Sequence, residues 1–76
     1  MTPLLQALEN KLHEITWVNA NDRETAVLLK KLGLTPGEFI SVISSFKDHV
    51  IIRKTDDTRV LLGSEAARCV LVRQLS

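Results

Sequence analysis

Few side chains in this sequence are of types that carry chemistry: two histidines, His13 and His49, and a single cysteine, Cys69. A structural or catalytic metal site needs three or four His, Cys or carboxylate ligands at suitable spacing. His13 has no such neighbour, so we interpret it as a strand histidine. His49 follows Asp48, and a carboxylate can orient a ligating histidine, but adjacent strand residues point to opposite faces. We therefore predict no metal ligand, and weak metal binding by His13 or His49 stays open.

Cys69 and the pair Asp56–Asp57 are the remaining candidates for catalysis. A nucleophilic cysteine needs a base and electropositive surroundings, and the sequence shows neither, so we expect Cys69 to be a small core residue on the last strand. Paired carboxylates can transfer protons, but a pair before Thr58 is more typical of a turn. Three glycines do not make a phosphate-binding loop. We predict no catalytic residue, no cofactor and no enzyme activity.

The composition excludes several classes of function. The chain has 76 residues and a net charge of +1, which fits a single small domain with one core. Nucleic-acid binders of this size are usually clearly basic and carry aromatic side chains for base stacking, whereas this chain has one tryptophan and two phenylalanines. No apolar run is long enough to span a membrane, and we find no signal peptide. We expect a cytoplasmic protein that neither binds nucleic acid nor inserts into a membrane.

The elements that would position these residues are mostly short strands separated by turns. Residues 1–9 form an N-terminal extension or a helical turn, and a single turn capped by Ser64 precedes the last strand. The alternation in the first strand predicts that Trp17 is buried or half-buried, or else anchors a partner. The pattern favours a mainly β fold, a small barrel of about five short strands with one α-helix between the first two. The predicted strands are Leu12–Val18, Glu38–Ser44, His49–Lys54, Arg59–Leu62 and Cys69–Arg73.

The ends of the helix are the clearest local prediction. Asn21 and Glu24 have the spacing of a capping box at its start. Gly33 supplies the left-handed residue that ends a helix. Pro36 followed by Gly37 predicts a type II turn directly afterwards. Three leucines fall on one face of this helix and are expected to pack on the barrel; they are Leu28, Leu29 and Leu32.

The segment 32–37, Leu-Gly-Leu-Thr-Pro-Gly, resembles the signature of the FeoA family: leucine-glycine-leucine, any residue, proline-glycine. The order of elements around it is also similar, over roughly residues 10–73. Ser45, Lys47 and His49 depart from the family pattern, because they replace two prolines and a glycine in one loop. Two further departures are Asp57, where the family usually has glycine, and Gly63, where it usually has arginine.

The resemblance implies that residues 1–76 form a single FeoA-like domain with an SH3-like barrel fold. It further implies a cytoplasmic accessory protein of bacterial ferrous iron transport. Such a protein binds and modulates the membrane ferrous iron transporter, of FeoB type, which carries a cytosolic GTPase region. The same fold occurs as the C-terminal domain of metal-dependent repressors, so a metal-responsive regulatory module is the alternative. The oligomeric state is not predicted.

A partner surface is predicted from the residues that the core does not need. Val27 falls on the far side of the helix among charged residues, and Leu29 lies near the edge of the packed face. The loop after the second predicted strand offers Phe46 between charges of both signs, Lys47 and Asp48, and Phe46 either folds over the barrel mouth or docks into a partner. An apolar residue surrounded by charge is the layout of small transient interfaces. We therefore expect the helix and this loop to contact the partner.

Overall fold

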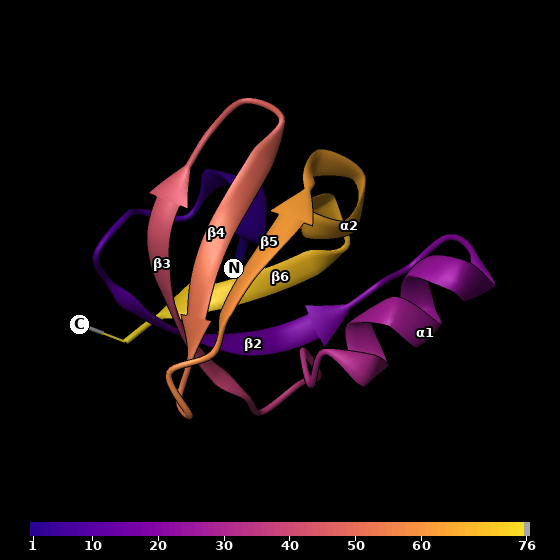
Figure 1. Ribbon diagram of the computed structural model, residues 1–76, viewed down its shortest axis with the longest axis horizontal. Helices are drawn as coiled ribbons and strands as arrows, with labels where there is room; N and C mark the ends of the chain where they lie inside the picture. Colours follow the sequence, from indigo (N-terminus) through magenta and orange to yellow (C-terminus); the bar gives the residue numbers. More distant parts are fainter. Residues whose placement is uncertain (76) are drawn as a thin grey trace.

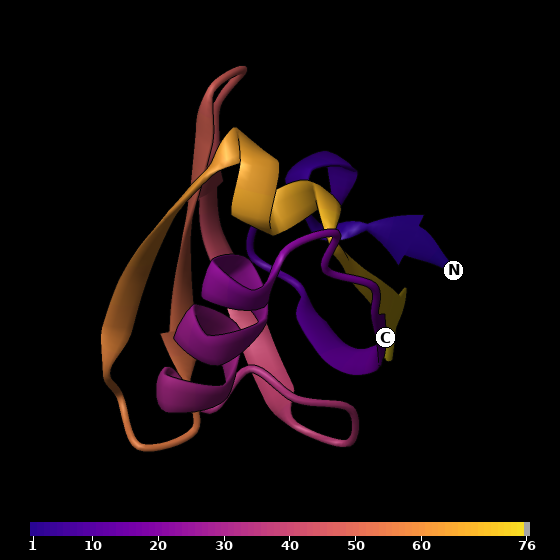
Figure 2. The ribbon, with the colours of Figure 1, turned by 90° about the vertical axis from the view of Figure 1, so that its right-hand side faces the viewer.

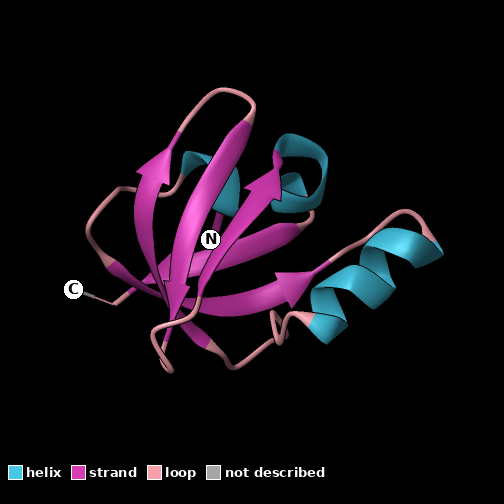
Figure 3. Ribbon diagram, viewed as in Figure 1, coloured by secondary structure: helices cyan, strands magenta, loops and turns pink. Residues whose placement is uncertain are grey.

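The computed structural model describes residues 1–75, which form one antiparallel sheet of six strands in the order β1-β6-β2-β3-β4-β5 (Figure 1). The mainly β prediction is confirmed, with one strand more than the sequence predicted. Two α-helices and a 3₁₀ turn, Leu4–Gln6, complete the fold (Figure 3). The helices are α1 (Arg23–Lys31) and α2 (Ser64–Arg68). The strands are β1 (Thr2–Pro3), β2 (Leu12–Val18), β3 (Phe39–Ser45), β4 (His49–Lys54), β5 (Arg59–Gly63) and β6 (Val70–Gln74).

The sheet curls around a single core of aliphatic side chains (Figure 1). The N-terminal segment belongs to this core, because Leu4 and Ala7 are buried in it and β1 pairs with β6. The helical turn expected near the N-terminus is present at Leu4–Gln6, whereas strand β1 was not predicted. The core residues are Leu4, Ala7, Ile15, Leu29, Leu34, Ile40, Val42, Val50, Ile52, Val60, Leu62, Ala67, Val70 and Val72.

A β-bulge in β2 sends Trp17 to the outside of the sheet. Ile15 faces Val72 on β6, but Trp17 faces Leu71, so Thr16 is the extra residue. An extra residue reverses the in-and-out alternation beyond it, and Trp17 is 56% exposed while Ile15 is fully buried. The expectation that Trp17 lies buried or half-buried is therefore wrong.

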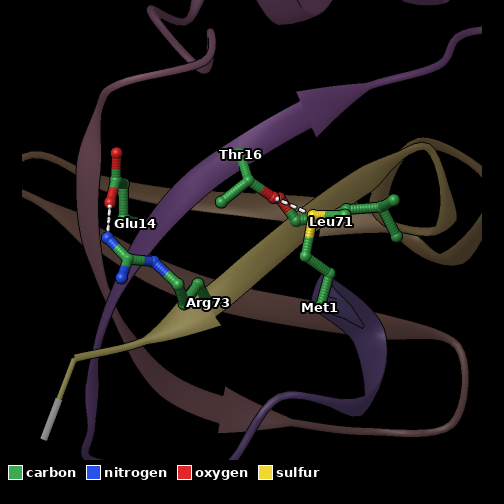
Figure 4. A network of polar contacts seen from close by, with 5 residues as sticks. All are labelled: Met1, Glu14, Thr16, Leu71 and Arg73. Atoms are coloured by element: carbon green, nitrogen blue, oxygen red, sulfur yellow. Dashed lines mark hydrogen bonds and ion pairs between the residues drawn. The ribbon is translucent and has the colours of Figure 1, made fainter.

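Polar contacts hold the bulge and the strands on either side of it (Figure 4). The Thr16 Oγ1 hydroxyl donates to the Leu71 carbonyl at 3.2 Å and lies 2.9 Å from Met1 Sδ. Further along the same pair of strands, the Arg73 guanidinium on β6 forms an ion pair with Glu14 on β2. β6 is thus fastened to β2 at the irregularity and on one side of it.

The chain around α2 differs from the sequence prediction. Ser64 is the first residue of α2, whose N-cap is Gly63, and no side chain caps the helix start. Cys69 is the C-cap of α2 rather than a member of the last strand. Its Sγ lies 3.3 Å from the Glu65 carbonyl and the residue is half-buried. The hydrogen bond holds the thiol against the end of α2.

Candidate partner-binding surface

The start of α1 is fixed by an aspartate one residue after the predicted cap. Asp22 is the N-cap, and its Oδ1 accepts a hydrogen bond from the Thr25 backbone N–H at 3.3 Å. The capping box predicted from Asn21 and Glu24 does not form, because the extended N-cap conformation falls on Asp22. Glu24 still lies in the first turn, where a negative charge complements the helix dipole.

The end of α1 is a complete Schellman motif. Gly33 has φ of +75°, as predicted. Its N–H donates to the Lys30 carbonyl at 3.0 Å, while the Leu34 N–H donates to the Leu29 carbonyl at 2.9 Å. These are the two bonds that define the motif, and the expected apolar contact between its ends is met by two core residues, Leu29 and Leu34.

The turn after α1 ties the helix to β2. The Glu38 N–H donates to the Thr35 carbonyl at 3.1 Å, which closes the turn around Pro36 and Gly37. Gly37 has φ of +97°, so the positive φ predicted for the second central position is confirmed. The Gly37 N–H donates to the Ile15 carbonyl at 2.8 Å, and this bond ties the turn that follows α1 to β2.

α1 projects beside the sheet and presents much of its surface to solvent (Figures 1 and 2). Leu29 is 1% exposed and is the buried residue of the helix, whereas Leu28 is 45% exposed and Val27 43%. Two expectations are corrected here. Leu28 does not pack on the sheet, and Leu29, which was expected to contribute to a partner surface, is enclosed in the core. Val27 is exposed to solvent on α1.

Trp17 stands between two hollows that α1 borders. One has a volume of about 530 Å³ and lies toward α2; the other has a volume of about 350 Å³ and lies toward the turn at Pro36. We call Trp17 and the two hollows beside it the α1-side surface; Val27 and Leu28 are exposed elsewhere on α1 and line neither hollow. Tryptophan is the residue type most enriched among side chains that dominate binding energy. The hollow toward α2 is lined by Trp17, Asn19, Asn21, Asp22, Thr25, Glu65, Arg68, Cys69 and Leu71, and the second by Trp17, Val18, Asn19, Ala20, Ala26, Leu29, Lys30, Leu34, Thr35 and Pro36.

The β3–β4 loop has a local order that the sequence did not suggest. The Phe46 ring stacks on the His49 ring with centroids 4.4 Å apart and an interplanar angle of 18°. His49 Nδ1 in turn lies 2.7 Å from Asp48 Oδ1. This hydrogen bond lowers the pKa of Asp48 below its ordinary value of 3.8. Phe46 therefore lies against His49 while 49% exposed, and Lys47 and Asp48 are exposed beside it.

The two predicted partner segments lie apart. In Figures 1 and 2 the tip of the β3–β4 hairpin and α1 are at different ends of the molecule, with α2 between them. A single small interface does not cover both. The α1-side surface and the loop with Phe46, Lys47 and Asp48 are two separate candidates.

The histidines also lie apart, on β2 and β4. His13 is 2% exposed, and its Nδ1 lies 3.0 Å from the Lys11 carbonyl, to which it donates. Within residues 1–75, no group of three or more His, Cys, Asp or Glu side chains is placed to hold a metal ion. None of the helices within residues 1–75 is both long and apolar enough to cross a bilayer.

Comparison with known proteins identifies the chain. The model of the FeoA domain matches residues 2–74. This chain belongs to the FeoA family. The FeoA crystal structure of an iron uptake regulatory protein superposes with a TM-score of 0.85 at 27% identity, covering 97% of each chain. The SH3-like fold and the association of the family with iron transport, both implied by the sequence resemblance, are confirmed.

The fold also occurs inside a larger regulator. A manganese-dependent transcriptional repressor, solved as its complex with manganese, superposes with a TM-score of 0.88 at 16% identity. The match covers 96% of this FeoA-family chain but 36% of the repressor, so the chain corresponds to about a third of that protein's length. At this identity the likeness concerns the fold alone. No curated protein matches the sequence at a significant level.

Proposed function

We propose that this FeoA-family chain is a cytoplasmic accessory protein of ferrous iron transport that binds the membrane ferrous iron transporter and modulates it. The observation that carries the proposal is the match of the FeoA domain over residues 2–74. A protein described as an iron uptake regulator shares the fold over 97% of both chains, which supports a regulatory rather than a catalytic contribution. On this proposal the chain itself catalyses no reaction.

The α1-side surface is the part of the molecule best suited to the contact. Trp17 offers a large apolar side chain at low conformational-entropy cost, and the hollows on both sides of it can receive side chains of a partner. Val27 and Leu28 are further exposed apolar side chains on α1, outside both hollows. Because such a surface is small, we expect micromolar affinity in solution, increased by tethering of both proteins near the membrane.

Direct binding to the transporter tests the proposal. The immobilised chain is exposed to the full-length ferrous iron transporter in lipid nanodiscs and, separately, to its isolated cytosolic GTPase region, with a Leu8→Ser variant as a control for non-specific contact. We expect saturable binding in the nanodisc experiment and a change in the rate of GTP hydrolysis when the chain is added. Absence of both effects at concentrations well above micromolar would refute the proposed function.

The metal-responsive module is the second candidate, favoured by the fold it shares with the repressor. It differs from the first in requiring a metal site on this chain. Anaerobic calorimetric titration with ferrous iron and with manganese separates the two. We expect no stoichiometric site of micromolar or tighter affinity, and such a site would favour the metal-responsive function instead.

A further inference from the structure

The β5 edge of the sheet carries an unusual combination of features. Within the described residues β5 pairs with β4 and with no other strand. Val60 and Leu62 point into the core, while Arg59, Leu61 and Gly63 lie on the outer face and are exposed. Leu61 is 64% exposed, and no atom lies within 4 Å of where a Cβ on Gly63 would stand. The outer face is therefore uncovered at Gly63, next to an edge that pairs with no further strand among the described residues.

The hydrogen-bond register shows which backbone groups of β5 face outward. The Lys54 N–H donates to the Thr58 carbonyl, and the Ser64 N–H donates to the Asp48 carbonyl. Since bonded and non-bonded pairs alternate along an antiparallel ladder, every second residue of β5 turns its N–H and C=O away from β4. These residues are Arg59, Leu61 and Gly63. The N–H groups of all three and the carbonyls of Arg59 and Leu61 therefore lie along the open edge, whereas the Gly63 carbonyl, as the N-cap of α2, accepts the first bond of that helix.

Two arginines lie directly across from each other beside this edge. Arg53 on β4 faces Arg59 on β5 in the register, and both side chains are exposed. Within residues 1–75 neither guanidinium forms an ion pair. Like charges directly opposite each other destabilise a sheet, so the arrangement weakens the isolated domain and would be relieved by a neighbouring anion.

We infer that the β5 edge binds an extended, acidic segment of a partner protein as an additional antiparallel strand. Pairing with Arg59, Leu61 and Gly63 places one partner side chain beside Leu61 and another, two residues further along the partner chain, beside Arg59. The first position suits an apolar residue and the second suits aspartate or glutamate. Main-chain bonds supply affinity in this mode, and the alternate side chains supply specificity.

Charge selects the acidic segment over a second copy of this chain. If two β5 strands paired antiparallel about Leu61, each Arg59 would face Gly63 of the other copy, and the Arg53–Arg59 pair would stay uncompensated. An acidic segment compensates it. The opposite edge of the sheet is unsuited to the same role, because β1 has two residues and one is Pro3, which has no N–H to donate.

A synthetic peptide tests the inference without reference to the transporter. The probe is a short acetylated and amidated peptide of alternating valine and threonine, with isoleucine at the position facing Leu61 and glutamate at the position facing Arg59. Its partners are the same peptide with lysine in place of glutamate, and the glutamate peptide with its pairing amides N-methylated. Binding to the intact chain is followed by the backbone amide signals in NMR spectra, for the wild-type chain and for Arg59→Glu.

We expect the glutamate peptide to shift the amide signals of Arg59, Leu61 and Gly63 at millimolar concentration. The lysine peptide should bind about fivefold more weakly, and Arg59→Glu should reverse the order of the two peptides. The N-methylated peptide should not bind. The inference is overturned if no shift occurs at millimolar peptide, if charge has no effect, if N-methylation has no effect, or if the β5 signals move with the concentration of the chain alone, which would indicate self-pairing.

Discussion

α1 contributes one buried side chain to the core, Leu29, whereas the β4–β5 hairpin contributes four: Val50, Ile52, Val60 and Leu62. Hydrogen bonds within a few residues define where α1 begins and ends, while ladder bonds to β3 and burial on the core hold the hairpin. From this difference we predict that the helix can loosen without loss of the sheet. A region of low local stability is where binding surfaces are commonly found.

Truncating Leu29, the buried residue of α1, should have the largest effect on stability. Leu29→Ala should destabilise α1 by about 2–5 kcal/mol, the usual range for a leucine truncated in a core. Because the other core residues lie outside α1, the loss should concentrate in α1. Hydrogen exchange measured by NMR should show amide protection falling at least about tenfold more in α1 than in β4. Equal losses in both would show that helix and sheet unfold as one unit.

Strain at the end of α1 should have the next largest effect. Gly33→Val should destabilise the domain by about 1–3 kcal/mol, because a β-branched residue is strained at φ of +75°. A new Cβ would meet Lys54 Nζ at 2.9 Å, but that flexible end can move, so backbone strain dominates. Thr35→Val is the matched control. Thermal unfolding should show a drop of several degrees for Gly33→Val alone, and a drop of a degree or two would contradict the assigned helix end.

Substitutions in the two candidate surfaces should have different effects on affinity for the transporter, and these effects should be smaller than those on stability. Trp17→Ser and Val27→Ser should weaken binding to the transporter in nanodiscs by about tenfold or more together, since aromatic anchors dominate such interfaces. Phe46→Ser, at the other end of the molecule, should leave affinity within about twofold. Unchanged melting must be shown first for each variant. The reverse order of effects would move the interface to the β3–β4 loop and leave the family assignment intact.

The smallest predicted effect is the titration of Asp48. The hydrogen bond from His49 lowers the pKa of this carboxyl in the folded chain, so its contribution to stability is present above the unfolded-state pKa and is lost as pH falls through the lowered folded-state pKa. His49→Ala should raise the midpoint toward 3.8, and Phe46→Ser should leave it nearly unchanged. An NMR titration of the Asp48 carboxyl carbon measures both. A midpoint unaffected by His49→Ala would remove the proposed cause.

Features with short-range causes were predictable from the sequence. β2 and β4 have the predicted bounds, and the positive φ values predicted for Gly33 and Gly37 are found, because those conformations depend on the residue itself and its near neighbours. The N-cap was misplaced by one residue. Asn21 and Asp22 are both good N-caps, and the spacing to Glu24 favoured the wrong one.

Features that depend on distant strands were not predictable. The bulge that exposes Trp17 exists only through pairing of β2 with β6, and nothing near Thr16 in the sequence marks it. Which of Leu28 and Leu29 is buried depends on how α1 is rotated against the rest of the fold, a difference of one helical position. For the same reason the sequence could not show that Phe46 and α1 lie at different ends of the molecule.

The position of β6 has a consequence for synthesis of the domain. β6 lies between β1 and β2, and Thr2 faces Val72 across the ladder. A growing chain can pair β2 through β5 by successive antiparallel contacts, but β1 has no partner until the last strand has left the ribosome. The edge of β2 that pairs with β6 also lacks its partner until then, as do the N-terminal leucines. Such long-range closure slows folding. The domain is therefore completed only after translation of residue 74, in one late step that joins its first strand to its last.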